Sequence, residues 1–408
     1  MPDHPTAAVP IRTAAAPARR LAAALAVLLG AVMFVLIGTE RPAQAATVQE
    51  VTSFGSNPGN LQMFRYVPDG LPSGRPLVVA MHGCSQNATG YGGTSGWTQL
   101  ADRHRFSVVL PQQRSANNAN SCFNWFEAGD IARGSGEALS IKQMIDRMRS
   151  DLGTTSSYVS GLSAGGAMSA VMLATYPDVF SGGGIVAGIP YRCGVGLSPA
   201  LSCMNPGTNL TPAQWGDKVR AAYSHSGPRP KISIWHGTAD TTVRPVNRVE
   251  LVEQWTNVHG TDQTPEVSDT VAGFPHKVYG SVVESFEITG MGHGEPVDPG
   301  TGTTQCGGAA AYMLDVNICA AHHMSRFWGL ISGTSPTTTP TTTTTAPPAA
   351  CFTDHNYGQV AAGRAHQSGG YTFANGSNQA MGLYNTFTRH TLKESPRGYF
   401  VIADSGCP

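Results

Sequence analysis

The residues with the clearest chemical potential lie in the segment GLSAG, from Gly161 to Gly165. This segment follows a short apolar stretch and precedes a helical pattern, which is the setting of a GxSxG nucleophile elbow. In such an elbow a tight turn presents the serine hydroxyl at the end of a strand. We therefore expect Ser163 to act as the nucleophile of an acyl transfer. An ordinary Gly/Ser turn before a helix is the simpler alternative.

A serine hydroxyl needs a base to take its proton and a carboxylate to orient that base. In the chain order Ser, Asp, His, the best candidates are Asp240 in WHGTAD and His293 in GMGHGE, because each follows a predicted strand. His236 precedes the acid and so breaks the order. The simpler alternatives are a solvated turn aspartate and a surface-loop histidine. Three further acids lack a strand-end setting: Asp262, Asp269 and Asp298.

Acyl transfer also needs two backbone N–H donors for the oxyanion of the tetrahedral intermediate. The residue after the nucleophile, Ala164, supplies one donor in this arrangement. The segment HGC follows an apolar run at residues 77–81, so the N–H of Cys84 is the second candidate. The alternative is that HGC is only a turn.

Alternating strand-like and helical patterns position these residues. Buried strands are predicted at residues 77–81, 107–110, 158–160, 232–235 and 282–288. Helices are predicted at residues 141–152, 167–176 and 246–257. This alternation predicts the α/β fold class, with the candidate residues in loops at one edge of the sheet.

The chain carries few charges, and they balance. Lys and Arg together number 26, Asp and Glu also number 26, and charged residues make up only 13% of the 408 residues. This composition has neither the basic footprint of a nucleic-acid binder nor that of a protein bound to anionic lipid. No Cys or His spacing matches a recognised metal-ligand pattern, so neither a metal nor another cofactor is expected. The expected partner is uncharged.

The first 45 residues have the composition of an export signal. Arginines precede an apolar run at residues 21–38, and the sequence AQA before Ala46 is a small-residue cleavage site. We expect cleavage after Ala45 and secretion to the extracellular space, with no lasting membrane association. An uncleaved membrane anchor is the alternative.

Eight cysteines in an exported chain predict four disulfides. A bond between Cys84 and Cys122 would hold the candidate oxyanion loop rigid. Other connectivities are open. Proximity along the chain suggests the pairs Cys84–Cys122, Cys193–Cys203, Cys306–Cys319 and Cys351–Cys407.

A Thr/Pro-rich tract at residues 334–350 separates two expected domains. Such a tract cannot bury a core and stays extended, so it is expected to be a linker. Residues 46–333 then form a catalytic domain, and residues 351–408 form a small, β-rich domain. Most of the small domain's aromatic residues are expected in its core, and any exposed ones could adsorb to a solid polymer. They are Phe352, Tyr357, Tyr371, Phe373, Tyr384, Phe387, Tyr399 and Phe400.

Five segments together carry a family resemblance: HGC at His82, CFNWFE at Cys122, GLSAGG at Gly161, WHGTAD at Trp235 and GMGHGEPV at Gly290. They resemble the extracellular polyhydroxybutyrate (PHB) depolymerase family of esterases, which is related to acetylxylan and feruloyl esterases. The resemblance covers nearly the whole larger domain. Residues 351–408 also resemble the short C-terminal domain of some depolymerases, which implies that they bind an insoluble, uncharged polymer. It implies an α/β-hydrolase fold with a triad of Ser163, Asp240 and His293. It also implies an oxyanion hole at Cys84 and Ala164.

The resemblance implies a secreted serine esterase that hydrolyses poly(3-hydroxybutyrate)-type polyesters through an acyl-enzyme. An acetylxylan or feruloyl esterase acting on plant polysaccharide would share the same catalytic residues and is the alternative. The complete Ser, Asp, His set argues against a non-catalytic polymer-binding protein. The hypothesis of a peptidase is weaker, because nothing in the sequence supplies a charged specificity pocket. Trp125 follows Cys122 closely and is a candidate contact for an uncharged polymer, with a core position as the alternative.

Overall fold

The computed structural model describes residues 46–331, 351–375, 377, 379–394 and 400–404. The expected signal segment at residues 1–45 and linker at residues 334–350 lie outside the described residues. The chain divides into two compact units, Met1–Gly333 and Thr334–Pro408, and each is described by itself. None of the helices in the described ranges is both long and apolar enough to cross a membrane.

The larger unit is built on one mixed sheet. In the described residues the sheet has ten strands, in the order β1-β2-β4-β3-β5-β6-β7-β10-β9-β8. Neighbours from β4 to β10 pair in parallel, whereas β1 and β2 at one edge and β9 and β8 at the other pair antiparallel. In spatial order the strands are β1 (Gln49–Val51), β2 (Gln62–Tyr66), β4 (Ser107–Gln112), β3 (Leu77–Met81), β5 (Ser157–Leu162), β6 (Phe180–Val186), β7 (Lys231–Gly237), β10 (Val283–Ile288), β9 (Phe274–Tyr279) and β8 (Val267–Val271).

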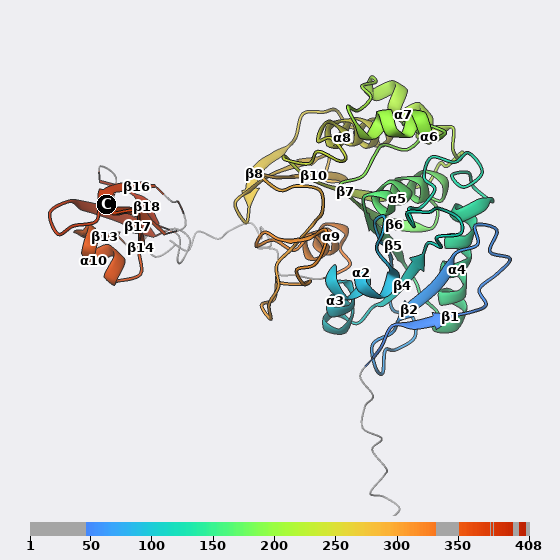
Figure 1. The fold of residues 1–408 in the computed structure, drawn as a ribbon, viewed down its shortest axis with the longest axis horizontal. Helices are drawn as coiled ribbons and strands as arrows, with labels where there is room; N and C mark the ends of the chain where they lie inside the picture. The colour runs from blue at the N-terminus through green and yellow to red at the C-terminus, as the bar shows by residue number, and fades with distance from the viewer. Residues whose placement is uncertain (1–45, 332–350, 376, 378, 395–399, 405–408) are drawn as a thin grey trace, which may run out of the picture. The chain divides into compact units, whose positions relative to one another are not determined.

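Helices cover both faces of this sheet (Figure 1). One face is covered by α2 (Ala88–Thr94), α3 (Trp97–His104) and α9 (Ala320–Trp328). The other is covered by α4 (Gly136–Leu152), α5 (Ala164–Thr175) and α8 (Val246–His259), with α7 (Pro212–Arg220) packed on α8. The unit also contains α6 (Leu197–Met204) and a short parallel pair, β11 (Glu295–Val297) and β12 (Met313–Asp315).

Strand β3 shows why the central strands read as continuous apolar runs. Alternate side chains of a strand point to opposite faces of the sheet. Leu77, Val79 and Met81 pack in the core under α4 and α5, whereas Val78 and Ala80 pack in the core under α2 and α3. All five are fully buried because helices lie on both sides. The predicted α/β class and the predicted central strands are confirmed.

The strand order places a crevice beside the loop after β3. Strand β3 lies between β4 and β5, so the chain leaves β3 toward one neighbour and later returns to the other. In open α/β sheets, ligands bind at such a switch point, outside the carboxyl ends of the strands. Cys84 follows β3 and Ser163 follows β5, so both lie at this position.

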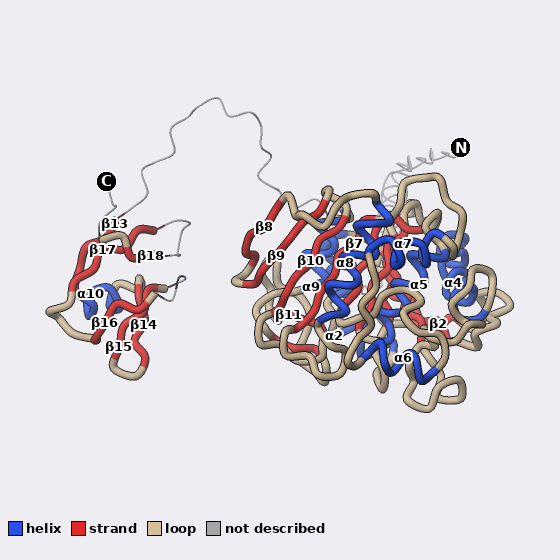
Figure 2. Tube along the Cα trace, turned by 90° about the horizontal axis from the view of Figure 1, so that it is seen from above, coloured by secondary structure: helices blue, strands red, loops and turns tan. Residues whose placement is uncertain are grey.

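The smaller unit contains two three-stranded antiparallel sheets and one short helix in its described residues. One sheet consists of β13 (Cys351–His355), β17 (Arg389–Glu394) and β18 (Phe400–Ile402). The other consists of β14 (Ala365–Ser368), β15 (Tyr371–Ala374) and β16 (Ala380–Leu383). Figure 2 shows the two sheets beside α10 (Asn356–Ala361). The β-rich character predicted from the sequence is confirmed.

The prediction that most aromatic residues fill the core of the smaller unit is wrong. Among the described ones only Phe400 is buried, in a core that also contains Ala365, Ala374, Met381 and Leu392 from four other strands. Two short sheets enclose too little volume to house eight rings. Four aromatic side chains are exposed instead: Tyr357 (50%), Tyr371 (52%), Tyr384 (37%) and Phe387 (89%).

Candidate active site

Ser163 occupies a strained turn between β5 and α5. Its backbone has φ 57° and ψ −116°, a conformation that is costly for a residue with a side chain. The turn is held because the N–H of Ser163 donates to the carbonyl of Val186 at 2.9 Å, and its carbonyl accepts from Ala167 at 2.8 Å. Helix α5 begins directly at Ala164, three residues earlier than its apolar pattern predicts.

The glycines on either side of Ser163 permit this turn because backbone passes close to them. A Cβ on Gly161 would collide with the backbone of Gly165, and a Cβ on Gly165 would collide with the carbonyl oxygen of Met81. Any side chain at either position would therefore push α5 away from β3 and β5.

Asp240 and His293 reach Ser163 from the ends of β7 and β10. These strands pair in parallel, so the loops that follow them lie at the same edge of the sheet as the turn after β5. His293 Nε2 lies 2.9 Å from Ser163 Oγ, and His293 Nδ1 lies 2.7 Å from Asp240 Oδ2. Because a carboxylate only accepts hydrogen bonds, Nδ1 carries the proton and Nε2 can accept the serine proton.

The carboxylate of Asp240 is buried and fully engaged. Its Oδ1 accepts the backbone N–H groups of Thr242 and Val243, each at 2.9 Å. Burial alone would raise the pKa of Asp240, but hydrogen bonds from His236 and His293 outweigh burial and hold that pKa below its ordinary value. The carboxylate therefore stays ionised and can stabilise an imidazolium form of His293.

The contact of His236 with Asp240 was not found by sequence reasoning, which treated His236 only as a rival base. His236 Nε2 lies 2.8 Å from the carbonyl oxygen of Val243 and 3.3 Å from Asp240 Oδ2. A carbonyl only accepts, so Nε2 carries a proton that is shared between the two oxygens. The available signal was the spacing of four residues between His236 and Asp240 across one strand-end turn.

Cys84 and Ala164 lie beside Ser163. Both line the same cavity as Ser163. Ala164 is the first residue of α5, whose initial N–H groups have no partner within the helix. Cys84 is bonded to Cys122, which ties the loop after β3 to the segment after β4. The arrangement can therefore aim two backbone donors at a carbonyl oxygen attacked by Ser163.

The disulfides follow the proximity pairing. The structure contains the bonds Cys84–Cys122, Cys193–Cys203 and Cys306–Cys319. The predicted Cys351–Cys407 bond involves Cys407, which lies outside the described residues.

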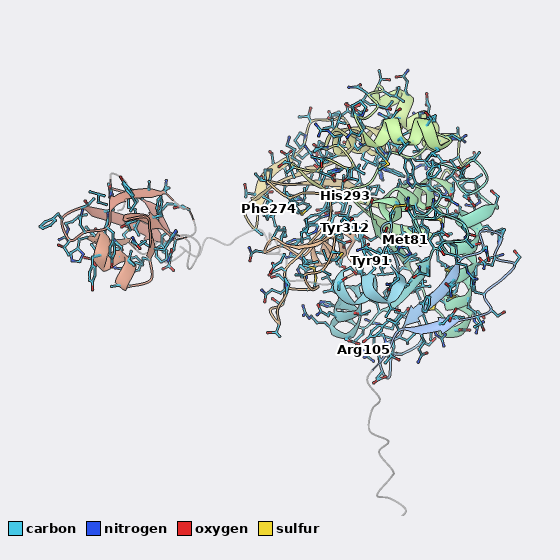
Figure 3. All side chains as sticks on the ribbon, viewed as in Figure 1. Met81, Tyr91, Arg105, Phe274, His293 and Tyr312 are labelled. Atoms are coloured by element: carbon cyan, nitrogen blue, oxygen red, sulfur yellow. A yellow bond between two sulfur atoms is a disulfide. The ribbon has the colours of Figure 1, made fainter. Side chains whose placement is uncertain are left out.

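Ser163 lies between two cavities. The larger, of about 380 Å³, has walls without a charged side chain. The smaller, of about 140 Å³, contains His293 and Tyr312, whose ring centroids are 6.2 Å apart (Figure 3). Trp125 lines the larger cavity and is only 7% exposed, so it is part of the cavity wall and not an exposed platform. The other apolar residues lining the larger cavity include Phe126, Ile189, Leu197, Ala200, Leu201, Met204 and Val243.

The loop that carries His293 is anchored by a buried carboxyl group. Tyr91 of α2 donates its hydroxyl to Glu295 Oε2 at 2.6 Å, and the N–H of Glu295 donates to the carbonyl of Tyr312 at 2.8 Å. Burial raises the pKa of Glu295 from 4.5 to about 8, against the opposing effect of the Tyr91 hydrogen bond. Glu295 is therefore protonated at neutral pH in the folded protein.

Glu295→Gln is expected to change how stability depends on pH. The folded protein binds one more proton than the unfolded chain between the ordinary pKa of 4.5 and about 8, so the wild-type free energy of unfolding falls as pH rises through this window. Glutamine resembles the protonated acid but does not titrate, so the variant lacks this pH-dependent contribution to the free energy of unfolding. The variant should gain stability relative to wild type by a few kcal/mol between pH 4.5 and 8.5, since one pKa unit corresponds to about 1.4 kcal/mol.

Urea unfolding followed by tryptophan fluorescence measures this difference, because all 6 tryptophans lie in the larger unit. Glu127→Gln, at an exposed carboxylate, is the matched control and should show no such trend. A stability difference between Glu295→Gln and wild type that stays constant with pH would contradict the assigned protonation.

Comparisons with known proteins agree with this geometry. The model of the family described as esterase PHB depolymerase matches residues 61–268. Poly(3-hydroxyalkanoate) depolymerase C of Paucimonas lemoignei is 59% identical over 290 residues, which cover 69% of this chain and 70% of that protein. Feruloyl esterase B of Talaromyces stipitatus is 36% identical over 267 residues, which cover 62% of this chain and 74% of that protein.

A solved structure gives the same fold. The acetyl xylan esterase from Aspergillus awamori superposes with a TM-score of 0.61 at 28% identity, covering 70% of this chain and all of that chain. The α/β-hydrolase fold and the resemblance drawn from the five sequence segments are thus confirmed. With a family model that spans half of the chain and a relative of this similarity, the protein belongs to the esterase PHB depolymerase family.

Proposed function

We propose that this protein is a secreted serine esterase that hydrolyses poly(3-hydroxybutyrate)-type polyesters to soluble oligomers and monomers. The observation that carries the proposal is the continuous hydrogen-bonded chain from Ser163 through His293 to Asp240, which opens onto an uncharged apolar cavity. In this proposal these three residues are the catalytic triad, and the N–H groups of Cys84 and Ala164 form the oxyanion hole.

The reaction proceeds through an acyl-enzyme. Ser163 Oγ attacks the ester carbonyl carbon while His293 Nε2 takes the hydroxyl proton, and the carbonyl oxygen becomes an oxyanion held by the two N–H groups. The C–O bond to the alcohol breaks, and His293 returns the proton to the leaving oxygen. Water then attacks the acyl-enzyme, giving its proton to His293, and the acid product leaves as Ser163 regains a proton.

The cavities support a polyester substrate. A hydroxyalkanoate chain has apolar side groups and no charge, which suits a wall of aromatic and aliphatic residues. An acetyl group would fill only a small part of a cavity of about 380 Å³. Leu197 and Leu201 of α6 line this cavity and are 61% and 54% exposed, so its apolar surface continues to the outside of the unit. The 59% identical relative is named for poly(3-hydroxyalkanoate) depolymerisation.

The smaller unit supports attachment to a solid polymer. The ring centroids of Tyr357 and Tyr384 lie 5.6 Å apart. Tyr371 of β15 lies opposite Leu383 of the neighbouring strand β16, and Leu383 is 55% exposed. Phe387 follows in the turn after β16 and is 89% exposed. Exposed rings of this kind adsorb to uncharged surfaces, and a linker at residues 334–350 would keep the catalytic domain at high local concentration.

Disulfides support export. The three bonds of the larger unit belong to an oxidising compartment, in agreement with a cleaved signal at residues 1–45 and an extracellular location. An extracellular enzyme can reach a polymer too large to enter a cell.

The proposal is tested by clearing of a poly(3-hydroxybutyrate) suspension, with release of acetate and ferulate from acylated xylan measured in parallel. We expect clearing, with little release from xylan. The double variant Tyr384→Ser, Phe387→Ser should clear the suspension several-fold more slowly and hydrolyse soluble p-nitrophenyl butyrate at the wild-type rate. Val267→Ser, at an exposed apolar residue on β8 of the larger unit, is the control for surface polarity.

Hydrolysis of xylan esters without clearing of the polyester would overturn the proposed substrate. The protein would then be a polysaccharide esterase, the activity named for the relative from Aspergillus awamori. Equal clearing by the double variant and by wild type would remove the adsorption role from this surface.

A further inference from the structure

The two cavities beside Ser163 differ in their relation to His293, which lines the smaller cavity and not the larger one. When the acyl-enzyme forms, His293 gives its proton to the oxygen of the leaving alcohol, so this alcohol must lie beside the imidazole. Both cavities are lined by Cys84 and Ser163, so the ester carbonyl lies where the cavities meet. The smaller cavity is therefore on the alcohol side of the ester, and the larger cavity is on the acyl side.

The ring of Tyr312 forms a wall of the smaller cavity. Its centroid lies 6.2 Å from that of the His293 ring, the two ring planes are 74° apart, and both side chains are labelled in Figure 3. Tyr312 is 48% exposed, so much of its surface is open to a ligand. Leu162 and Met204 also line this cavity. An aliphatic alcohol bound beside His293 would therefore cover an aromatic surface that is otherwise in water.

A tight turn presents Tyr312 to the cavity. Ala310 and Met313 exchange two backbone hydrogen bonds, of 3.1 and 3.0 Å, and so close a turn that contains Ala311 and Tyr312. Tyr312 has φ 64°, a left-handed conformation that is uncommon for a residue with a bulky side chain. Glycine or asparagine would fit this position with less strain. Strain of this kind persists where the surrounding structure holds it, and it gathers at binding sites.

The turn is fixed to the loop that carries His293. The carbonyl of Tyr312 accepts the N–H of Glu295 at 2.8 Å, and a Cβ on Gly294 would collide with this same carbonyl oxygen. On the other side, the Gln86 side chain donates to the carbonyl of Ala311 at 3.3 Å. The ring is thus held at a constant place relative to the imidazole before any substrate binds.

We propose that Tyr312 is a specificity-determining residue that packs its ring against the alcohol part of the ester. In a 3-hydroxybutyrate polyester this part is the next unit toward the carboxyl end, attached through a secondary carbon that carries a methyl group. This inference rests on the proposed function and deepens it, because it requires His293 to protonate the leaving alcohol. It assigns to the ring a role in acylation and none in deacylation, since the alcohol has left by then.

Two soluble butyrate esters test the proposal with the full chain. Methyl 3-butyryloxybutyrate has one capped hydroxybutyrate unit as its alcohol part, whereas methyl butyrate has only methanol. Both form the same butyryl-enzyme, so the ratio of their kcat/KM values for butyrate release depends on the alcohol part alone. A third ester, p-nitrophenyl butyrate, reports deacylation through the steady rate that follows an initial burst of nitrophenol.

We expect Tyr312→Ala to lower kcat/KM for methyl 3-butyryloxybutyrate by about 10-fold more than for methyl butyrate, and to leave the deacylation rate unchanged. Tyr312→Phe keeps the ring and should retain both kcat/KM values within about 3-fold of wild type. Both variants keep a Cβ at the same φ, so they share the strain of the turn. Leu197→Ala, in the wall of the larger cavity, is the control and should change both kcat/KM values by the same factor.

An equal loss for the two esters in Tyr312→Ala would overturn the proposal, because the ring would then act on His293 and not on the alcohol. A slower deacylation rate would do the same. Tyr312→Phe that is as slow as Tyr312→Ala would assign the effect to the hydroxyl instead of the ring. Failure of the proposed function is distinguishable, because a wild-type protein that does not clear polyester can still be compared on the butyrate esters.

Discussion

Ser163→Ala is expected to lower kcat for ester hydrolysis by about a million-fold while leaving the fold intact. Without the hydroxyl no acyl-enzyme can form, and only binding and the oxyanion donors remain to assist water. Alanine has the same Cβ as serine and so fits the same strained turn. No helix cap is lost either, because the Ser163 side chain makes no hydrogen bond that caps α5. The melting midpoint should therefore stay close to that of wild type.

Ser169→Ala is the matched control for this variant. Ser169 lies on α5 and is fully buried, and its hydroxyl donates to the carbonyl of Gly165 at 2.9 Å. It should retain wild-type turnover and become labelled by a fluorophosphonate at one site, as the wild type does. Ser163→Ala should take up no label by mass spectrometry. Turnover within about 10-fold of wild type in Ser163→Ala would remove Ser163 from the role of nucleophile.

The central part of the fold was predictable because burial on both faces leaves a direct mark on the sequence. Residues 77–81 form an apolar run and residues 232–235 are mostly apolar, and the structure places strands β3 and β7 over them. The edge strands leave no such mark. Strand β8 is almost entirely exposed and contains Ser, Asp and Thr, so nothing in its own sequence distinguishes it from a loop. Its pairing with β9 is a tertiary property.

Glycine content also hid two helical segments. Helix α2 has the sequence ATGYGGT and begins after Asn87, whose side chain caps it by accepting from the N–H of Gly90. Helix α5 begins within the glycine-rich elbow at Ala164. Glycine disfavours helices in isolation, and here contact with the sheet overrides that preference. In the elbow the glycines are required by the approach of β3, which no local pattern reveals.

The candidate site was predictable where chain order constrains it and hidden where geometry alone decides. Ser163, Asp240 and His293 come together as the order of strands implies. The contact of His236 with Asp240 was missed, because it depends on how one ring is turned within a loop. Sequence order excludes His236 as the base but says nothing about its hydrogen bond to the acid.

Asp240→Asn is expected to lower kcat by about 10⁴-fold through the wrong tautomer of His293. Two backbone N–H groups, of Thr242 and Val243, point at Oδ1, so the asparagine must place its oxygen there and its NH₂ toward His293. An NH₂ facing Nδ1 requires Nδ1 to accept, which moves the ring proton to Nε2. With that proton in place, Nε2 cannot take the proton of Ser163.

The variant Asp240→Ala separates this tautomer effect from a loss of stability. Alanine leaves the N–H groups of Thr242 and Val243 without their side-chain acceptor, so its melting midpoint should fall below that of Asp240→Asn. Alanine does not impose a tautomer, so its kcat should be no lower than that of asparagine. Asp262→Asn is the control, since Asp262 also accepts an N–H two residues ahead but lies in an exposed loop. If Asp240→Asn keeps kcat within about 10-fold of wild type, Asp240 does not set the tautomer, and another group must hold the imidazole during proton transfer.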